Sequence, residues 1–224
     1  MSASEKAGRR FALSVRPWVS ARPFLAAAGA VFLLVFGAFR PDVRAEEPRF
    51  LAGRLLVATP EIRNGPFART VIYMIRHDKA GAMGLVVNRG IARGPLADLV
   101  AGLTRNSREA GGLKGEILVH YGGPVAPGTG FVLHSTDYMR HSSVLVGKRY
   151  ALTSDIRVLQ DIGRGKGPRL RLFAFGYAGW GPGQLESEMR RRFWISVPAE
   201  EGLIFGPNLG DKWRRALALQ EEAL

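Results

Sequence analysis

The segment from Gly176 to Glu186 (GYAGWGPGQLE) constrains the fold more than any other part of the sequence. An apolar run, Leu170 to Phe175, leads into it, and a charged stretch with helical spacing, Gln184 to Arg192, follows it. Four glycines within eight residues permit positive φ and close contact between backbones. We therefore expect a buried strand to end here, in a tight bend that carries Tyr177 and Trp180 and opens a helix.

Composition limits the chemistry available to this chain. Its 224 residues suit one ordinary domain plus an extension, and a hydrophobic fraction of 46% supplies a core. The absence of cysteine excludes disulfides, thiol nucleophiles and cysteine metal sites. The net charge of +13 is scattered along the chain, which is typical of a solvated basic surface. Such a surface also attracts nucleic acid, anionic lipid or acidic proteins.

The N-terminal segment has the pattern of an export signal. Residues 1–23 are polar and basic, and residues 24–39 (FLAAAGAVFLLVFGAF) are apolar and uncharged. As a helix those sixteen residues would span roughly 24 Å, which is short of the ~30 Å hydrocarbon core and favours a signal-peptide core. A small-residue cleavage site ends at Ala45. We therefore expect residues 1–45 to export the protein to the periplasm or to anchor it in the membrane through residues 24–39.

Two basic residues leave alternatives open for this segment. Arg40 and Arg44 follow the apolar core directly, and positive charge there resists translocation. Alternatively, the start codon is mis-assigned and residues 1–45 are not translated, in which case the protein would be cytoplasmic. In each case we expect the globular domain to occupy residues 46–224.

Short strands dominate the pattern of the globular part. Strands bounded by turn residues are expected at 53–58, 69–76, 82–88, 117–121, 130–134, 142–146, 150–153, 170–175, 193–197 and, more briefly, 203–205. Helical spacing predicts about four helices, over 95–103, 154–162, 184–192 and from 210 onward. Strands and helices do not alternate strictly. We therefore expect a single α+β domain with a mainly antiparallel sheet.

The chain also contains four segments that occur together in a known family: ATPEIRNGPFARTVIYMIRHDKAGAMGLVVNRG, GGPVAPGTGFVLHS, FGYAGWGPGQLESE and FWISVPAEEGLIF. They resemble the AlgH/YqgE family of bacterial proteins over residues 50–219. The resemblance implies an α+β fold with a coiled, bifurcated antiparallel sheet. It implies no agreed catalytic residues and no established activity, although some members carry the label of transcriptional regulator. Members are mostly described as soluble and cytoplasmic, so residues 1–45 depart from the family pattern.

The glycine-rich bend supplies the first candidate site. Tyr177 and Trp180, followed by Gln184 and Glu186 at a helix start, could hold a planar or anionic ligand. The alternative is that Trp180 fills the core while the two polar side chains satisfy free N–H groups of the helix. We favour this second interpretation.

The histidines supply weaker candidates. His77 precedes a carboxylate, Asp78, but neighbours in sequence seldom point the same way. His120 and His134 each end an expected strand and could share a metal with Asp137, although no metal-ligand spacing supports this. We keep His77 and His134 as candidate ligand-binding residues and expect neither a metal site nor a cofactor.

Binding is the expected role. Nucleic acid is indicated by charge alone, at residues 190–192 and at Lys212, Arg214 and Arg215, since no DNA-reading motif is present. We predict a non-catalytic binding or regulatory domain whose partner is another protein or, on that charge, nucleic acid. The alternative is an enzyme with a small-ligand pocket lined by Trp180, His77 and His134.

Overall fold

A computed structural model describes residues 50–221 of the chain, and within that range the fold is α+β with ten strands and six helices. The strands are β1 (Leu55–Ala58), β2 (Val71–Asp78), β3 (Gly81–Val86), β4 (Gly90–Pro95), β5 (Glu116–Tyr121), β6 (Val125–Ser135), β7 (Val144–Val146), β8 (Tyr150–Thr153), β9 (Arg171–Trp180) and β10 (Trp194–Val197). The helices are α1 (Leu96–Thr104), α2 (Ser107–Ala110), α3 (Arg157–Gly163), α4 (Gln184–Arg190), α5 (Glu201–Phe205) and α6 (Leu209–Glu221).

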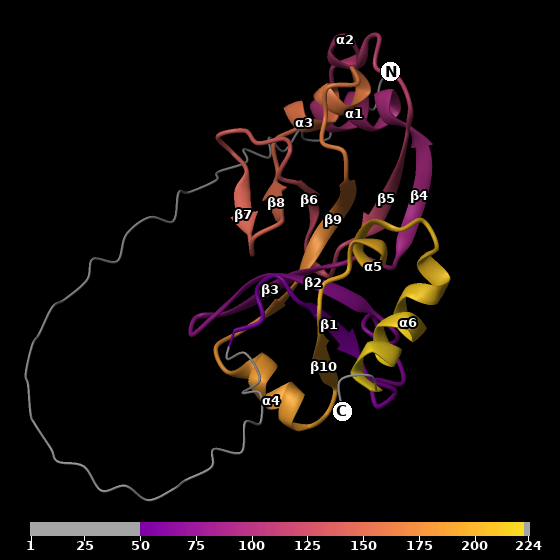
Figure 1. Cartoon of the computed structure of the whole chain (residues 1–224). Coiled ribbons are helices and arrows are strands. Elements are labelled where there is room, and N and C mark those ends of the chain that lie inside the picture. Colours follow the sequence, from indigo (N-terminus) through magenta and orange to yellow (C-terminus); the bar gives the residue numbers. More distant parts are fainter. Residues whose placement is uncertain (1–49, 222–224) are drawn as a thin grey trace, which may run out of the picture. The chain divides into compact units, whose positions relative to one another are not determined.

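The sheet is curled and almost wholly antiparallel, as the sequence predicted. Its main path runs β10-β1-β2-β3-β9-β6-β8-β7, and β4 joins it through β5. The described strands contain one parallel pair, β5 with β9. In Figure 1 strand β9 crosses the centre of the domain, from the helices α1 and α3 at one end to α4 at the other. The rest of the fold is therefore arranged around β9.

The sheet forks along one edge of β9. The middle of the strand, Phe173–Phe175, pairs with β5, whereas its last residues, Ala178–Trp180, pair with β3. Strand β6 occupies the opposite edge. One branch continues through β3, β2, β1 and β10, and the other through β5 and β4. This confirms the bifurcated sheet that the family resemblance implies.

Gly176 lies at the fork and has φ +70°. The register with β6 shifts at this point, from Phe175 opposite Gly130 to Tyr177 opposite Val125. The sequence prediction that the strand ends at Phe175 is wrong, because Gly176 accommodates a bulge and the strand continues to Trp180. The bend itself is limited to residues 181–183, where Gly183 adopts φ +71° immediately before α4.

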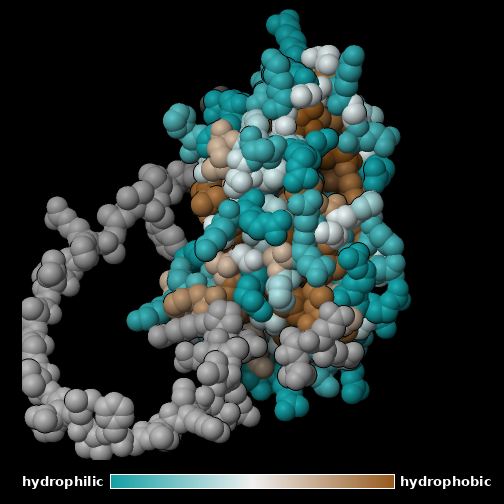
Figure 2. Space-filling view, in the orientation of Figure 1, coloured by the Kyte–Doolittle hydropathy of each residue, from teal (hydrophilic) through white to brown (hydrophobic). Residues whose placement is uncertain are grey.

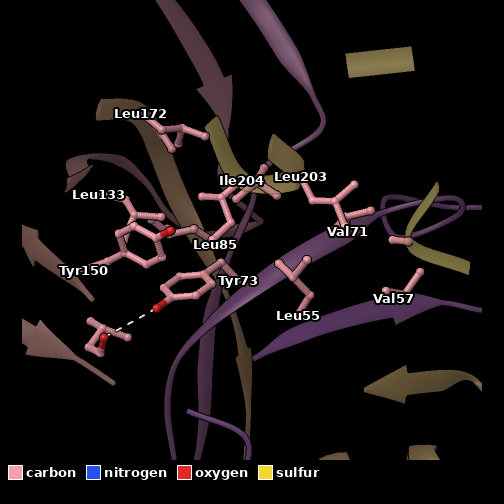
Figure 3. Packing of buried hydrophobic residues seen from close by; sticks show 14 of the residues in the cluster. Leu55, Val57, Val71, Tyr73, Leu85, Leu133, Tyr150, Leu172, Leu203 and Ile204 are labelled. Atoms are coloured by element: carbon pink, nitrogen blue, oxygen red, sulfur yellow. Dashed lines mark hydrogen bonds between the residues drawn. The ribbon is translucent and has the colours of Figure 1, made fainter. Parts of the chain in front are cut away.

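Aromatic packing marks the largest buried cluster. Tyr73 on β2 and Tyr150 on β8 meet edge to face at 5.8 Å, among Leu55, Leu133 and other aliphatic side chains (Figure 3). The Tyr73 hydroxyl donates to the carbonyl of Val146 at 3.4 Å. The Tyr150 hydroxyl is buried without a hydrogen-bond partner among the described residues. Burial raises the pKa of both hydroxyls, so neither ionises near neutral pH.

Lys212 fastens α6 to the sheet. Its side chain is buried, and Nζ donates to the carbonyls of Val87 at 3.0 Å and Ile204 at 2.7 Å. Burial lowers the pKa of this amine to about 8. The sequence places Lys212 with surface cations, but in the structure it belongs to the interior. Helix α6 turns this position toward the carbonyls of Val87, directly after β3, and of Ile204 in α5.

The remaining differences from the sequence prediction concern short elements. The four predicted helices are present, and α2 and α5 are additional. The strand expected at 203–205 is wrong, because one turn of helix buries Leu203 and Ile204 together. Strand β4 was not predicted, since its residues are mostly exposed and show no apolar alternation.

The described residues also correct the prediction of a transmembrane helix with a signal peptide. No helix within residues 50–221 is long and apolar enough to cross a membrane. The segment on which the prediction was based, residues 1–45, lies outside the described residues. The membrane or periplasmic location expected from the sequence therefore gains no support here.

Candidate functional site

The glycine-rich corner is filled with aromatic side chains. Trp180 is 7% exposed, stacks on Phe67 at 6.3 Å and meets Trp194 edge to face at 5.8 Å. Phe67 also contacts Trp194, at 5.7 Å. Tyr177 lies on the other side of the bulge, half-buried against Phe131. The corner thus presents packed rings rather than an open aromatic platform.

Glu188 organises the polar atoms of this corner, and the sequence analysis missed it. Its Oε2 accepts hydrogen bonds from the indole N–H groups of Trp180, at 2.9 Å, and Trp194, at 2.8 Å. Its Oε1 accepts one from the amide of Gln184, whose own oxygen accepts from the Gly181 N–H. The sequence signal available was the spacing of Gln184 and Glu188, which places them on one helix face.

His77 and Glu186 form a second polar link at the same corner. The Leu51 N–H donates to Nδ1 of His77 at 3.2 Å, so in the neutral ring the proton lies on Nε2 and is donated to Glu186, also at 3.2 Å. The His77 side chain is almost fully buried, and Phe50 packs edge to face on it. His77 and Trp180 are neighbours through Ala82, which pairs with each of them across the sheet.

His134 lies at the opposite end of β9 from these residues. It is fully buried and pairs across the sheet with Arg171, nine residues before Trp180. Nine extended residues span about 30 Å, so His134 does not share a pocket with His77 and Trp180. Of the candidates from the sequence, the structure therefore groups His77, Trp180, Gln184 and Glu186 and separates His134 and Tyr177 from them. Within the described range, no three His, Asp or Glu side chains are grouped as metal ligands.

A concave site lies elsewhere among the described residues, in a cleft over β5 and β9. Figure 2 shows it as a hollow of hydrophobic surface bordered by hydrophilic side chains. Its volume is about 190 Å³, and α3 and the end of α5 form its sides. The apolar lining consists of Ile117, Leu118, Val132, Leu159, Ile162, Leu172, Phe173, Ile204 and Phe205.

Charged side chains stand at the rim of this cleft. Arg93 comes from β4, Glu116 from β5 and Arg171 from β9. Arg93 and Glu116 are 4.0 Å apart, with side chains 59% and 66% exposed, so they neutralise each other only weakly. Arg171 donates to the Pro168 carbonyl at 3.1 Å. The rim thus carries a net positive charge next to apolar walls.

His120 is the buried polar group in the lining of the cleft. It is 5% exposed, and its Nδ1–H donates to the Phe173 carbonyl at 3.1 Å. Burial, followed by repulsion from Lys212 and Arg93, lowers its pKa to about 4. The imidazole is therefore neutral at physiological pH, and the positive charge of the site comes from the arginines.

The sequence alone does not reveal this cleft, because its residues come from six separate segments. The one available signal was the placement of Leu118 and His120 on the same face of a predicted strand. Nothing local connects them with Arg93 or Arg171.

His120 makes the unfolding free energy depend on pH in the acidic range. Its folded pKa lies below the ordinary value of 6.5, so the unfolded chain binds more protons between pH 6.5 and 4, and stability falls as the pH is lowered through that range. The parent chain is expected to lose unfolding free energy as the pH is lowered from 7 to 4. In His120→Gln this loss should be smaller by roughly 2–3 kcal/mol, because the buried imidazole is no longer there to be protonated. Urea unfolding at both pH values measures this. The exposed His141 is the matched control, and His141→Gln should keep the parental pH dependence; an unchanged dependence in His120→Gln would contradict the assignment.

Comparison with known proteins places the chain in one family. A family model described as AlgH-like (DUF179) matches residues 55–224. A UPF0301 protein of Methylococcus capsulatus is 42% identical over 178 residues, which cover 80% of this chain and 96% of the relative. A UPF0301 protein of Sinorhizobium medicae is 42% identical over 77% of this chain and 88% of its own length.

Solved structures agree with this placement. The solution structure of the AlgH protein from Pseudomonas aeruginosa has a TM-score of 0.64 and 32% identity, covering 78% of this chain and 90% of that one. A crystal structure of a Corynebacterium diphtheriae protein, with a TM-score of 0.55 and 18% identity over 72% of this chain and 82% of its own, shares the fold. Since the family model spans almost the whole domain and curated relatives match along most of their length, the chain belongs to the uncharacterised AlgH-like (UPF0301) family.

Proposed function

We propose that this protein is a binding domain that takes a small amphipathic anion, an apolar body carrying a carboxylate or similar group, into the cleft over β5 and β9. The observation that carries the proposal is the combination of a mainly apolar lining with two arginines and one glutamate at the rim. Burial of the apolar body contributes the affinity, at about 25 cal/mol per Å² removed from water. The arginines select the sign of the charge.

The chemistry of the lining supports binding rather than a reaction in this cleft. Arginine remains protonated at any physiological pH and does not exchange protons with a ligand. His120, the buried titratable group, is neutral and has its Nδ1–H occupied by the Phe173 carbonyl. A regulatory role would follow if ligand occupancy altered the surface formed by α3 and α5, whose side chains line the cleft.

A charge-matched set of eight-carbon probes tests this function. We expect octanoate to bind to the full chain in calorimetric titration and octylamine, with the opposite charge, not to bind. Arg93→Gln and Arg171→Gln should each weaken octanoate binding roughly fivefold, because each removes a charge-assisted hydrogen bond at an exposed rim. Arg191→Gln, at an exposed arginine outside the cleft, is the control and should leave the affinity unchanged.

Three results would overturn the proposal. They are no octanoate binding, equal binding of octanoate and octylamine, and an unchanged affinity in both rim variants. A chemical-shift map that places octanoate away from Leu118 and Phe173 would do the same.

A further inference from the structure

A second constellation, outside the cleft, pairs a serine hydroxyl with a buried imidazole. Oγ of Ser143 lies 3.4 Å from Nε2 of His134, and the Nδ1 of His134 lies 2.9 Å from the carbonyl oxygen of Ser135. Neither residue of the pair lines the cleft. The pair joins the loop before β7 to the end of β6.

The Ser135 carbonyl fixes the tautomer of the imidazole. A carbonyl oxygen only accepts, so Nδ1 must carry the proton of the neutral ring, and Nε2 carries the lone pair. The hydroxyl of Ser143 is then the donor and His134 the acceptor. This is the orientation in which an imidazole removes a proton from a nucleophilic hydroxyl.

The surrounding groups hold both partners in place. His134 is fully buried and packs edge to face with Tyr138 at 5.7 Å. Asp161 in α3 accepts hydrogen bonds from Tyr138 at 2.6 Å and from Arg140 at 2.5 Å. These bonds hold the loop between β6 and β7 against α3. The Arg140 N–H in turn donates to Oγ of Ser143 at 3.3 Å. The base is therefore shielded from water, while the half-buried Ser143 remains accessible.

Exposed apolar side chains flank Ser143 in the sequence. Met139, Val144 and Leu145 are 49%, 64% and 56% exposed and lie close to Ser143 in the chain. Exposed hydrophobic groups clustered on a loop and an edge strand often mark a contact site for an apolar molecule. They would seat the acyl chain of a substrate beside the hydroxyl.

We propose that Ser143 and His134 form a nucleophile–base pair that accepts acyl groups from esters of apolar acids. In the acylation step the Oγ–C bond forms, the hydroxyl proton moves to Nε2 of His134, and the ester C–O bond breaks. The imidazolium returns that proton to the departing alkoxide, so His134 is neutral again. Water then attacks the acyl-serine with His134 as base, which releases the acid and restores the hydroxyl.

A reactive-serine probe tests the pair directly. An alkyl fluorophosphonate forms the Oγ–P bond and loses fluoride, and the resulting adduct is located by mass spectrometry of peptides from the full chain. We expect the adduct on Ser143, no labelling of Ser143→Ala, and labelling roughly a hundredfold slower in His134→Gln. Ser142→Ala is the matched control and should label at the parental rate, because Ser142 bonds Asp155 and Thr153 rather than an imidazole.

If the His134→Gln variant does not fold, the position of the adduct in the parent chain still tests the proposal. Ser142 is the more exposed of the two adjacent serines. A label chosen by exposure would therefore fall on Ser142 or on both, and a label chosen by activation falls on Ser143. The proposal is refuted by an unlabelled parent chain, by an adduct at Ser142, or by a folded His134→Gln variant that reacts as fast as the parent.

Discussion

Replacing Trp180 by alanine is expected to lower the free energy of unfolding by about 3–5 kcal/mol, the range for removing a large aromatic side chain from a core. The indole is 7% exposed and lies between Phe67 and Trp194, so its loss leaves a cavity lined by two rings. The change also removes one of the two indole donors to Glu188, which raises the cost of keeping that carboxylate half-buried. Urea unfolding of the purified chain measures the difference.

Trp180→Phe keeps an aromatic ring between Phe67 and Trp194 while removing the indole N–H donor. Phenylalanine keeps one six-membered ring in the site but removes the N–H group and part of the volume of the indole, and Glu188 retains the Trp194 and Gln184 donors. We expect a loss of roughly 1–2 kcal/mol for this variant. A near-native unfolding midpoint for Trp180→Ala, accompanied by a change in ligand binding, would instead assign the indole to a binding surface.

Much of the fold could be predicted because its signals are local. Runs of β-branched residues such as Val71–Ile75 identify strands, and the turn at 77–81 identifies the hairpin of β2 and β3. The five-residue helix α5 was predicted as a strand, because Leu203–Phe205 is a short apolar run whose conformation is decided by burial against α6 and the sheet. A local sequence pattern does not predict the conformation of a short segment when tertiary contacts determine it.

The fork of the sheet shows the same limit at longer range. The glycines at 122, 123 and 176 indicated turns, and two of them do have positive φ. The structural role of Gly122 depends on contacts between strands that are far apart in the sequence. Its N–H donates to the Phe175 carbonyl in β9, and its carbonyl accepts from the Val86 N–H in β3. No spacing within one segment contains that information.

The candidate sites divide along similar lines. The corner residues Gln184 and Glu186 were identified from one continuous segment. The corner's central carboxylate, Glu188, was not, because one of its donors, Trp194, comes from β10. The cleft was missed entirely, since Arg93, His120 and Arg171 are brought together by three different strands.

Replacing Gly123 by alanine is expected to cost about 4 kcal/mol or more, which is exceptional for a single methyl group. Gly123 has φ +150°, a conformation that side chains rarely adopt. A Cβ at this position would overlap the backbone of Tyr177 and Ala178, where β5 leaves β9 and β3 takes its place. Backbone cannot move aside as a flexible side chain can, so the two branches of the sheet would have to separate.

Gly128→Ala is the matched control on the neighbouring strand. Gly128 lies in β6, its φ is not positive, and an added Cβ meets no atom within 4 Å. We expect its unfolding free energy to stay within about 0.5 kcal/mol of the parent, the range for substitutions that touch nothing. Equal unfolding midpoints for the two alanine variants would mean that the branches do not close tightly on β9 at Gly123. A large difference in unfolding free energy between the two variants would show that the close contact at Gly123 is what lets both branches of the sheet pair with β9.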